Sequence, residues 1–352
     1  MKKLSLLLLL LTSSFLLVSQ SKPHRVIVIM TDGLRWQEVF RGLDSVIANN
    51  KKYHHGDSLS IFQKYWAPTV EERRQKLMPF FWSTIQEKGE IHGNRDKGSL
   101  TNVANPYWFS YPGYSELTTG QVDTAVNSND YKPNPNTNFF EYLNTLPTYK
   151  GKVVAFGAWD AFDRILNEKR AGFPVINAFD EYVKIGNDAQ AQLLTNMVKD
   201  THRPFGNAEV LDVFMHYQIM HYLQKEKPMA AFLSYGDTDE FAHEGNYSYY
   251  LNAAHAFDKY VNDIWNFVQS NADFKDNTTI LITTDHGRGD KIKSQWTSHG
   301  QKVLDSKETW YVMLGKGVQI AGEVTTKEQA YSKDLIHRLA KIIGVTFRSE
   351  KK

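Results

Sequence analysis

The chain has 352 residues, of which 41 are basic and 39 acidic, so its formal net charge is +2. This balance gives no sign of the basic surface that nucleic-acid binding needs, nor of an acidic tail. The sequence contains no cysteine, which excludes disulfides, thiolate metal sites and cysteine nucleophiles. Any metal site must therefore be built from His, Asp, Glu or hydroxyl ligands.

The N-terminus has the pattern of a secretory signal peptide. Lys2 and Lys3 precede an apolar run at residues 4–18, and small polar residues follow it. We therefore expect residues 1–20 to be a signal peptide, and the mature protein to be secreted or periplasmic with no membrane span. A retained membrane anchor is the alternative, although the apolar run is short for a bilayer span.

Short β-branched apolar runs alternate with helical stretches along the rest of the chain. The runs predict strands that are buried on both faces, at residues 25–30, 153–156, 229–234, 279–283 and 311–314. Helices are expected at residues 34–40, 139–146, 209–225, 249–269 and 332–343. This alternation indicates an α/β fold with a doubly wound, mostly parallel central sheet and helices on both faces. The polar residues 51–76 and 126–138 should form long loops or a small cap over the site.

Carboxylates follow three of the predicted strands. Asp32 comes after the first strand, Asp237 and Asp239 after the third, and Asp285 after the fourth. Ligands of open α/β sheets bind at the carboxyl ends of the strands, so these side chains should converge on one edge. Such convergence is much harder to obtain by chance than any single motif.

Three histidines accompany these carboxylates. His243 follows Asp239 by four residues, which places both side chains on one helix face. His286 directly follows Asp285, and the next glycine allows a turn that brings both side chains onto one ion. His299 lies in a later loop. Taken singly, each pattern also fits an ordinary surface carboxylate or a solvated histidine, so only the combination favours a metal site.

A serine-containing turn lies in the segment S-Y-P-G-Y-S-E-L-T-T-G, which begins at Ser110. The nucleophile elbow G-x-S-x-G of serine hydrolases is not satisfied around Ser115, because Leu117 stands at its last position. The Ser-x-Pro turn can instead present Ser110 at the mouth of a helix that starts near Gly113. A helix N-terminus stabilises an anion, so a phosphoryl group fits there.

The motifs M-T-D-G, S-Y-P-G-Y-S-E-L-T-T-G, D-x-x-x-H, T-D-H-G and a late H-G occur in this order between residue 25 and about residue 344. Their order and spacing resemble the alkaline phosphatase superfamily, in particular its nucleotide pyrophosphatase/phosphodiesterase-like branch. The resemblance implies one catalytic domain over residues 21–352. It also implies a metal-dependent hydrolase of small phosphate esters that uses two divalent ions, with zinc the expected metal.

The resemblance also assigns roles to individual residues. The ligands of one ion would be Asp239, His243 and His299, and those of the other would be Asp32, Ser110, Asp285 and His286. Ser110 would be the catalytic nucleophile and would carry the phosphoryl group as a phospho-serine. Asn129 is the residue expected to bind a phosphoryl oxygen of the substrate. Sites with three N or O ligands and an open position suit catalytic zinc.

One departure from the family pattern concerns the substrate. Tyr114 stands where many diesterase relatives have His and where sulfatase-like relatives have Arg, which disfavours sulfate esters. Phosphate monoesters and diesters both remain open. The alternative functions are a phosphotransferase or mutase of the same superfamily, and a non-catalytic binding protein on this fold.

Overall fold

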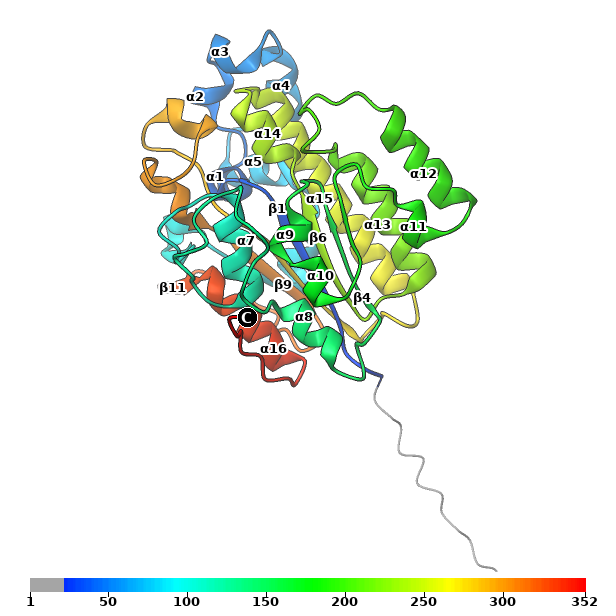
Figure 1. The fold of residues 1–352 in the computed structure, drawn as a ribbon. Helices are drawn as coiled ribbons and strands as arrows, with labels where there is room; N and C mark the ends of the chain where they lie inside the picture. The colour runs from blue at the N-terminus through cyan, green and yellow to red at the C-terminus, as the bar shows by residue number, and fades with distance from the viewer. Residues whose placement is uncertain (1–21) are drawn as a thin grey trace, which may run out of the picture.

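A long mixed sheet forms the centre of the molecule in the computed structural model, which describes residues 22–352 (Figure 1). The expected signal peptide lies outside the described residues. The eight strands are β1 (Arg25–Thr31), β2 (Gly89–His92), β4 (Val153–Gly157), β5 (Val175–Asn177), β6 (Ala230–Tyr235), β7 (Thr278–Thr284), β9 (Tyr311–Gly315) and β10 (Gly322–Glu323). Their order is β10-β2-β9-β7-β1-β6-β4-β5. The strands from β7 to β5 run parallel, whereas β9 is antiparallel to both of its neighbours, so the sheet is mostly parallel as predicted.

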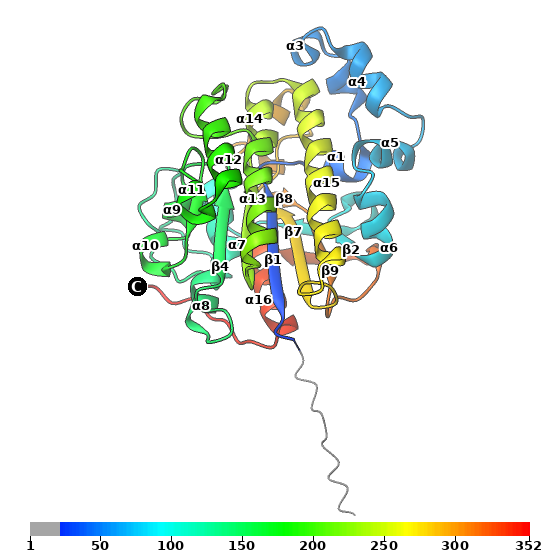
Figure 2. The same cartoon turned by 90° about the vertical axis from the view of Figure 1, so that its right-hand side faces the viewer.

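Helices cover both faces of this sheet. In front of it in Figure 1 lie α7 (Ser110–Thr119), α8 (Phe139–Thr145), α9 (Phe162–Ile165), α10 (Glu168–Ala171) and α16 (Ser332–Ile342). The opposite face carries α13 (Asp212–Glu226), α14 (Asp237–His243) and α15 (Tyr247–Ser270), which Figure 2 brings to the front. This is the doubly wound α/β arrangement that the alternating pattern indicates.

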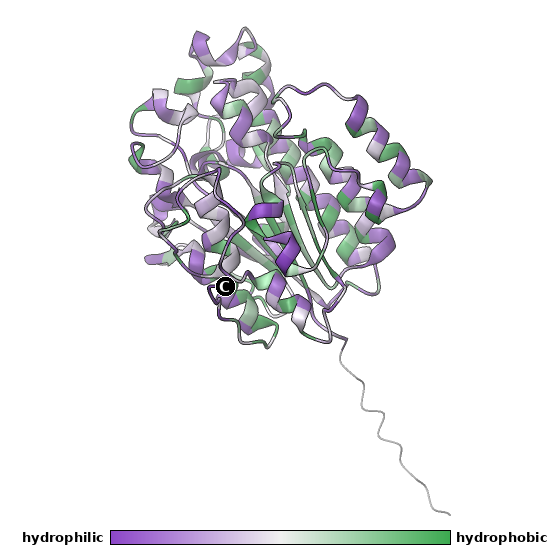
Figure 3. Cartoon of the chain, viewed as in Figure 1, coloured by the Kyte–Doolittle hydropathy of each residue, from purple (hydrophilic) through white to green (hydrophobic). Residues whose placement is uncertain are grey.

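The alternation of side chains in β1 explains why two layers of helices are needed. Val26, Val28 and Met30 belong to the core under α7, α8 and α16. Ile27 and Ile29 belong to the core under α13 and α15. Successive side chains of a strand point to opposite faces, so an apolar run can be buried only between two layers. The hydropathy colours of Figure 3 show the apolar strands enclosed in this way.

The five strands and five helices predicted from the sequence are present, with ends shifted by a few residues. Residues 51–76 were predicted as long loops or a small cap, and the prediction of loops is wrong because the segment is largely helical. They form α3 (Lys51–His54) and α4 (Ser58–Tyr65) and most of α5 (Val70–Leu77). The polar composition reflects helices that expose one side, and Thr69 and Glu72 begin α5 with a capping box. Residues 126–138 form an irregular connection, as expected.

Several short elements had no clear sequence signal. A second, three-stranded sheet contains β3 (Ser99–Asn102), β8 (Glu308–Thr309) and β11 (Glu328–Tyr331). Helices without a prediction are α2 (Ser45–Ala48), α6 (Gln86–Lys88), α11 (Val183–Gly186) and α12 (Ala189–Asp200), with short helical turns η1 (Phe81–Ile85), η2 (Arg95–Lys97), η3 (Lys293–Thr297) and η4 (Leu304–Lys307). The helix predicted at residues 34–40 is α1 (Trp36–Arg41). Within residues 22–352, no helix combines the length and the hydropathy that crossing a bilayer requires.

Candidate metal centre

Three neighbouring strands end at the same edge of the sheet and deliver the three predicted carboxylates. β1 pairs with β6 on one side and β7 on the other, and Thr31 at its end lies beside Tyr235 and Thr284. Asp32 and Asp285 directly follow β1 and β7, and Asp239 lies in the first turn of α14 after β6. The parallel register therefore places all three carboxylates at one edge of the sheet. Open α/β sheets bind their ligands at this edge, outside the carboxyl ends of the strands.

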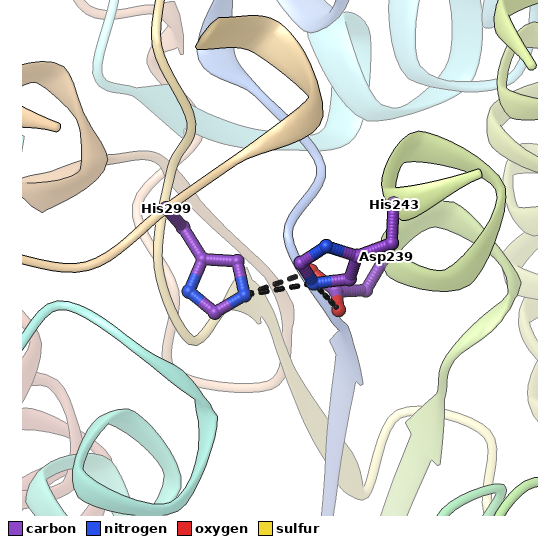
Figure 4. Close-up of side chains that lie close together, drawn as sticks. All are labelled: Asp239, His243 and His299. Carbon is purple, nitrogen blue, oxygen red and sulfur yellow. Dashed lines mark hydrogen bonds and ion pairs between the residues drawn. The ribbon is translucent and has the colours of Figure 1, made fainter. Parts of the chain in front are cut away.

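The first group of side chains consists of Asp239, His243 and His299, whose ligand atoms all lie within 4.8 Å of one another (Figure 4). The Nε2 atoms of the two histidines are 2.9 Å apart, and His243 Nε2 is 3.0 Å from Asp239 Oδ2. His243 reaches this point because it follows Asp239 by one helical turn of α14. One carboxylate oxygen and two imidazole nitrogens thus face a common centre.

The second group consists of Asp32, Asp285 and His286, which are buried and also within 4.8 Å of one another. His286 Nε2 is 3.2 Å from Asp32 Oδ1 and 3.4 Å from Asp285 Oδ2. The hydroxyl oxygen of Ser110 lies 3.3 Å from the same ring nitrogen. The two groups adjoin, because His286 Nε2 is also 3.8 Å from Asp239 Oδ1.

The electrostatics of these groups fit bound cations. Burial and the negative charge of Asp239 raise the pKa of Asp32, and burial and the charge of Asp32 raise the pKa of Asp285. Among the described residues, Asp32 Oδ1 and Asp285 Oδ2 are buried without a hydrogen-bond partner. Such atoms are costly unless something positive meets them. A set of carboxylate oxygens and imidazole nitrogens suits divalent zinc or manganese.

Helix α7 places Ser110 against the second group. The helix begins at Ser110 itself, three residues earlier than the start near Gly113 that the sequence predicted. Gly113 allows the helix to approach the turn after β7, since a Cβ at this position would overlap the carbonyl oxygen of Asp285. Ser115 lies farther along α7, and its hydroxyl accepts a hydrogen bond of 2.8 Å from Asn134 Nδ2. The two serines therefore have different surroundings.

Asn129 lies at the N-terminus of α7, beside Ser110. Its side-chain oxygen accepts a hydrogen bond of 3.0 Å from the backbone N–H of Tyr111. The residue thus satisfies a helix N-terminal donor and holds the irregular connection against α7. Its predicted role in binding a phosphoryl oxygen stays a prediction.

Sequence reasoning missed Arg288, which lies within the site. Arg288 is buried, forms an ion pair with the carboxylate of Asp239 and donates to its backbone carbonyl at 3.0 Å. Gly33 makes room for it, because a Cβ there would lie 2.9 Å from Arg288 Nε and 2.5 Å from Asp239 Oδ1. The arginine comes two residues after His286, immediately beyond the T-D-H-G motif, and that closeness to the motif was the available signal.

A second missed feature is the support of the loop before Ser110. The buried carboxylate of Glu116 in α7 accepts hydrogen bonds from Ala104 N at 2.8 Å and from Asn105 N at 2.7 Å. Asn105 Oδ1 in turn accepts from Tyr107 N at 2.9 Å and from Trp108 N at 3.0 Å. Trp108 has a φ of 56°, which a bulky side chain rarely adopts. Glu116 thereby connects α7 to the loop that precedes Ser110.

Comparisons with known proteins found one family model and several solved structures that are similar to the chain. A family model described as the metalloenzyme superfamily matches residues 209–305. Five of the predicted ligands lie inside that match, namely Asp239, His243, Asp285, His286 and His299. No curated protein sequence matches the chain.

Solved structures with the same fold include murine ectonucleotide pyrophosphatase/phosphodiesterase 5, an inactive variant in complex with AMP. It has 12% identity and a TM-score of 0.56, over 92% of this chain and 96% of the murine chain. A lipoteichoic acid synthase from Listeria monocytogenes has 10% identity and a TM-score of 0.54, over 92% and 73% of the two chains. An alkaline phosphatase superfamily protein from Vibrio parahaemolyticus has 11% identity and a TM-score of 0.51, over 94% and 68%.

Proposed function

Since the chain shares its fold with proteins of the alkaline phosphatase superfamily, we propose that it is a two-metal hydrolase of phosphate esters that acts through a phospho-serine at Ser110. The observation that carries this proposal is the position of the Ser110 hydroxyl, 3.3 Å from His286 Nε2 and at the first residue of α7. A nucleophile beside a ligand group and at a helix N-terminus is the arrangement that phosphoryl transfer needs.

The two ligand groups would each hold one ion. We assign Asp239, His243 and His299 to one, and Asp32, Ser110, Asp285 and His286 to the other. Bound there, divalent ions such as zinc would supply the positive charge that lowers the pKa of a hydroxyl and stabilises a departing oxygen. Asp32 and Asp285 each have a buried oxygen with no hydrogen-bond partner in the described part of the chain, which supports this assignment.

The chain's own residues define the rest of the reaction. Ser110 Oγ forms a bond to phosphorus as the bond between phosphorus and the leaving alkoxide breaks. The hydroxyl proton passes to solvent, and the alkoxide takes up a proton. Negative charge on the phosphoryl oxygens faces the N-terminus of α7, whose dipole stabilises it. Water then attacks phosphorus and restores the Ser110 hydroxyl, which releases phosphate when the substrate is a monoester and a phosphate monoester when it is a diester.

Two alternative functions are a phosphotransferase or mutase and a non-catalytic binding protein. A phosphotransferase or mutase would pass the phosphoryl group to an acceptor other than water. A non-catalytic binding protein is disfavoured, because every predicted ligand position is filled and a hydroxyl adjoins the ligands. The AMP bound to the murine relative supports a small phosphate ester as ligand.

We also propose that residues 21–352 form one catalytic domain, and that the segment at residues 1–20 directs its export.

A metal analysis combined with paired assays tests the proposal. The protein without residues 1–20 should contain about two divalent ions per chain. It should hydrolyse 4-nitrophenyl phosphate, bis(4-nitrophenyl) phosphate or both, and the ratio of the two rates decides between monoester and diester. Asp239→Ala should lose an ion and activity, whereas Asp334→Ala, at an exposed position on α16, should keep both. Two bound ions without hydrolysis of either ester would contradict the proposal.

A further inference from the structure

The hydroxyl of Tyr114 lies against the second ligand group. Tyr114 is on α7, one helical turn after Ser110, and its side chain is buried. Its hydroxyl donates a hydrogen bond of 3.1 Å to Asp32 Oδ2 and accepts one of 2.8 Å from Ser234 Oγ. Ser234 lies near the end of β6, next to β1, so three elements meet at this hydroxyl.

The two oxygens of Asp32 are therefore not equivalent. Oδ2 accepts the hydrogen bond from Tyr114, whereas Oδ1 is buried, has no hydrogen-bond partner within residues 22–352 and lies 3.2 Å from His286 Nε2. A carboxylate that is held at one oxygen presents the other in a fixed direction. Groups behind a metal ligand commonly orient it in this way.

The ring of Tyr114 is itself held in place. It packs edge-on against Phe162 and Phe232, with ring centroids at 4.9 Å and 6.4 Å. The hydrogen bond from Ser234 uses a lone pair of the phenol oxygen and leaves its proton for Asp32. The donor is thus defined in position and in the direction of its proton.

We propose that Tyr114 is a positioning residue that fixes Asp32 with Oδ1 toward the metal ion of the second group. The inference rests on the proposed function, because it concerns one of the two ions assigned there. Tyr114 is buried and donates to the carboxylate of Asp32, so its effect is expected on the affinity of one ion, with loss of activity as a consequence.

The test is zinc binding by Tyr114→Phe, which keeps the ring and removes the hydroxyl. Competition with a chromophoric chelator should show one of the two ions bound about tenfold more weakly or worse, and the other unchanged. The weakened ion should be the one that Asp285→Ala loses and His243→Ala retains. Tyr111→Phe is the matched control, because this tyrosine of α7 donates to the backbone carbonyls of Lys132 and Arg164, away from Asp32.

Wild-type affinity for both ions in Tyr114→Phe would overturn the inference, and so would equal weakening of both ions. If that variant does not fold, Ser234→Ala decides, since it removes the hydrogen bond that orients the Tyr114 hydroxyl. Weaker binding of the same single ion in Ser234→Ala supports the inference, and unchanged binding overturns it. A wild-type protein that binds no zinc would instead contradict the proposed function itself.

Discussion

Ser110 and Ser115 lie in the same helix, yet the structure gives their hydroxyls different neighbours. Ser110 Oγ is 3.3 Å from His286 Nε2, whereas Ser115 Oγ accepts a hydrogen bond from Asn134. The motif S-Y-P-G-Y-S already favoured Ser110 in the sequence, because the residue precedes Pro112 and the start of a helix. Arg288 directly follows the T-D-H-G motif and Tyr114 lies within the serine motif, but the sequence did not show their contacts with Asp239 and Asp32. They reach Asp239 and Asp32 only through the tertiary fold.

Ser110→Ala tests whether the hydroxyl of Ser110 is the nucleophile. Ser110→Ala should lower kcat on the order of a thousandfold or more, because it removes covalent catalysis and leaves the electrostatic environment in place. The thermal unfolding temperature should stay close to that of the wild type. Steady-state kinetics with an aryl phosphate measures the effect, and Ser115→Ala is the control from the same helix, expected to lose far less. Full activity of Ser110→Ala would refute the assignment.

At the scale of elements, the site depends on how closely α7 approaches the turn after β7. Apolar runs and turn residues identified the strands, and strand ends identified the carboxylates, because a parallel sheet collects its ligands at one edge. Other elements lay beyond local patterns. The antiparallel direction of β9 depends on pairing between distant residues, and β2 and β5 are too short for a clear periodicity. The sequence pattern did not predict the helices of residues 51–76, because the exposed sides of these helices are polar.

Gly113→Ala tests the approach of α7 to the site. In an open helix, alanine is more favourable than glycine by roughly 1 kcal/mol. At Gly113 the sign should reverse, because the new Cβ would overlap the carbonyl oxygen of Asp285. We expect the free energy of unfolding to fall by about 1–3 kcal/mol, measured with urea, together with weaker metal binding and lower activity. A more stable variant with full activity would show that the helix does not contact the turn in this way.

At the scale of the whole molecule, the structure concentrates negative charge in its interior. Asp32, Asp239 and Asp285 are buried at the edge shared by β1, β6 and β7, between the two layers of helices. Arg288 forms an ion pair with Asp239, and His286 Nε2 lies 3.2 Å from Asp32 Oδ1. The fold resemblance and the sheet were predictable from motif order and alternation, whereas the balance of charge depends on burial, which a sequence does not show.

Removal of metal should therefore destabilise the whole protein. Ions that bind only the folded state add about 3 kcal/mol of stability when their concentration is a hundredfold above Kd. Dialysis against a chelator should lower Tm on the order of 5 °C or more, and addition of zinc should restore it. Calorimetry measures the change, and Asp239→Ala should show a smaller response to the chelator. An unchanged Tm after complete metal removal would argue that the ligand groups hold no ion.

Trapping the covalent intermediate tests most directly whether Ser110 is the nucleophile. The enzyme is mixed with an excess of aryl phosphate, quenched with acid during turnover, digested and analysed by mass spectrometry. Phosphate is expected on the peptide that contains Ser110, localised to that residue by fragmentation and absent from Ser110→Ala. Phosphate localised to Ser115, or rapid turnover with no phosphorylated residue in wild-type protein, would contradict it.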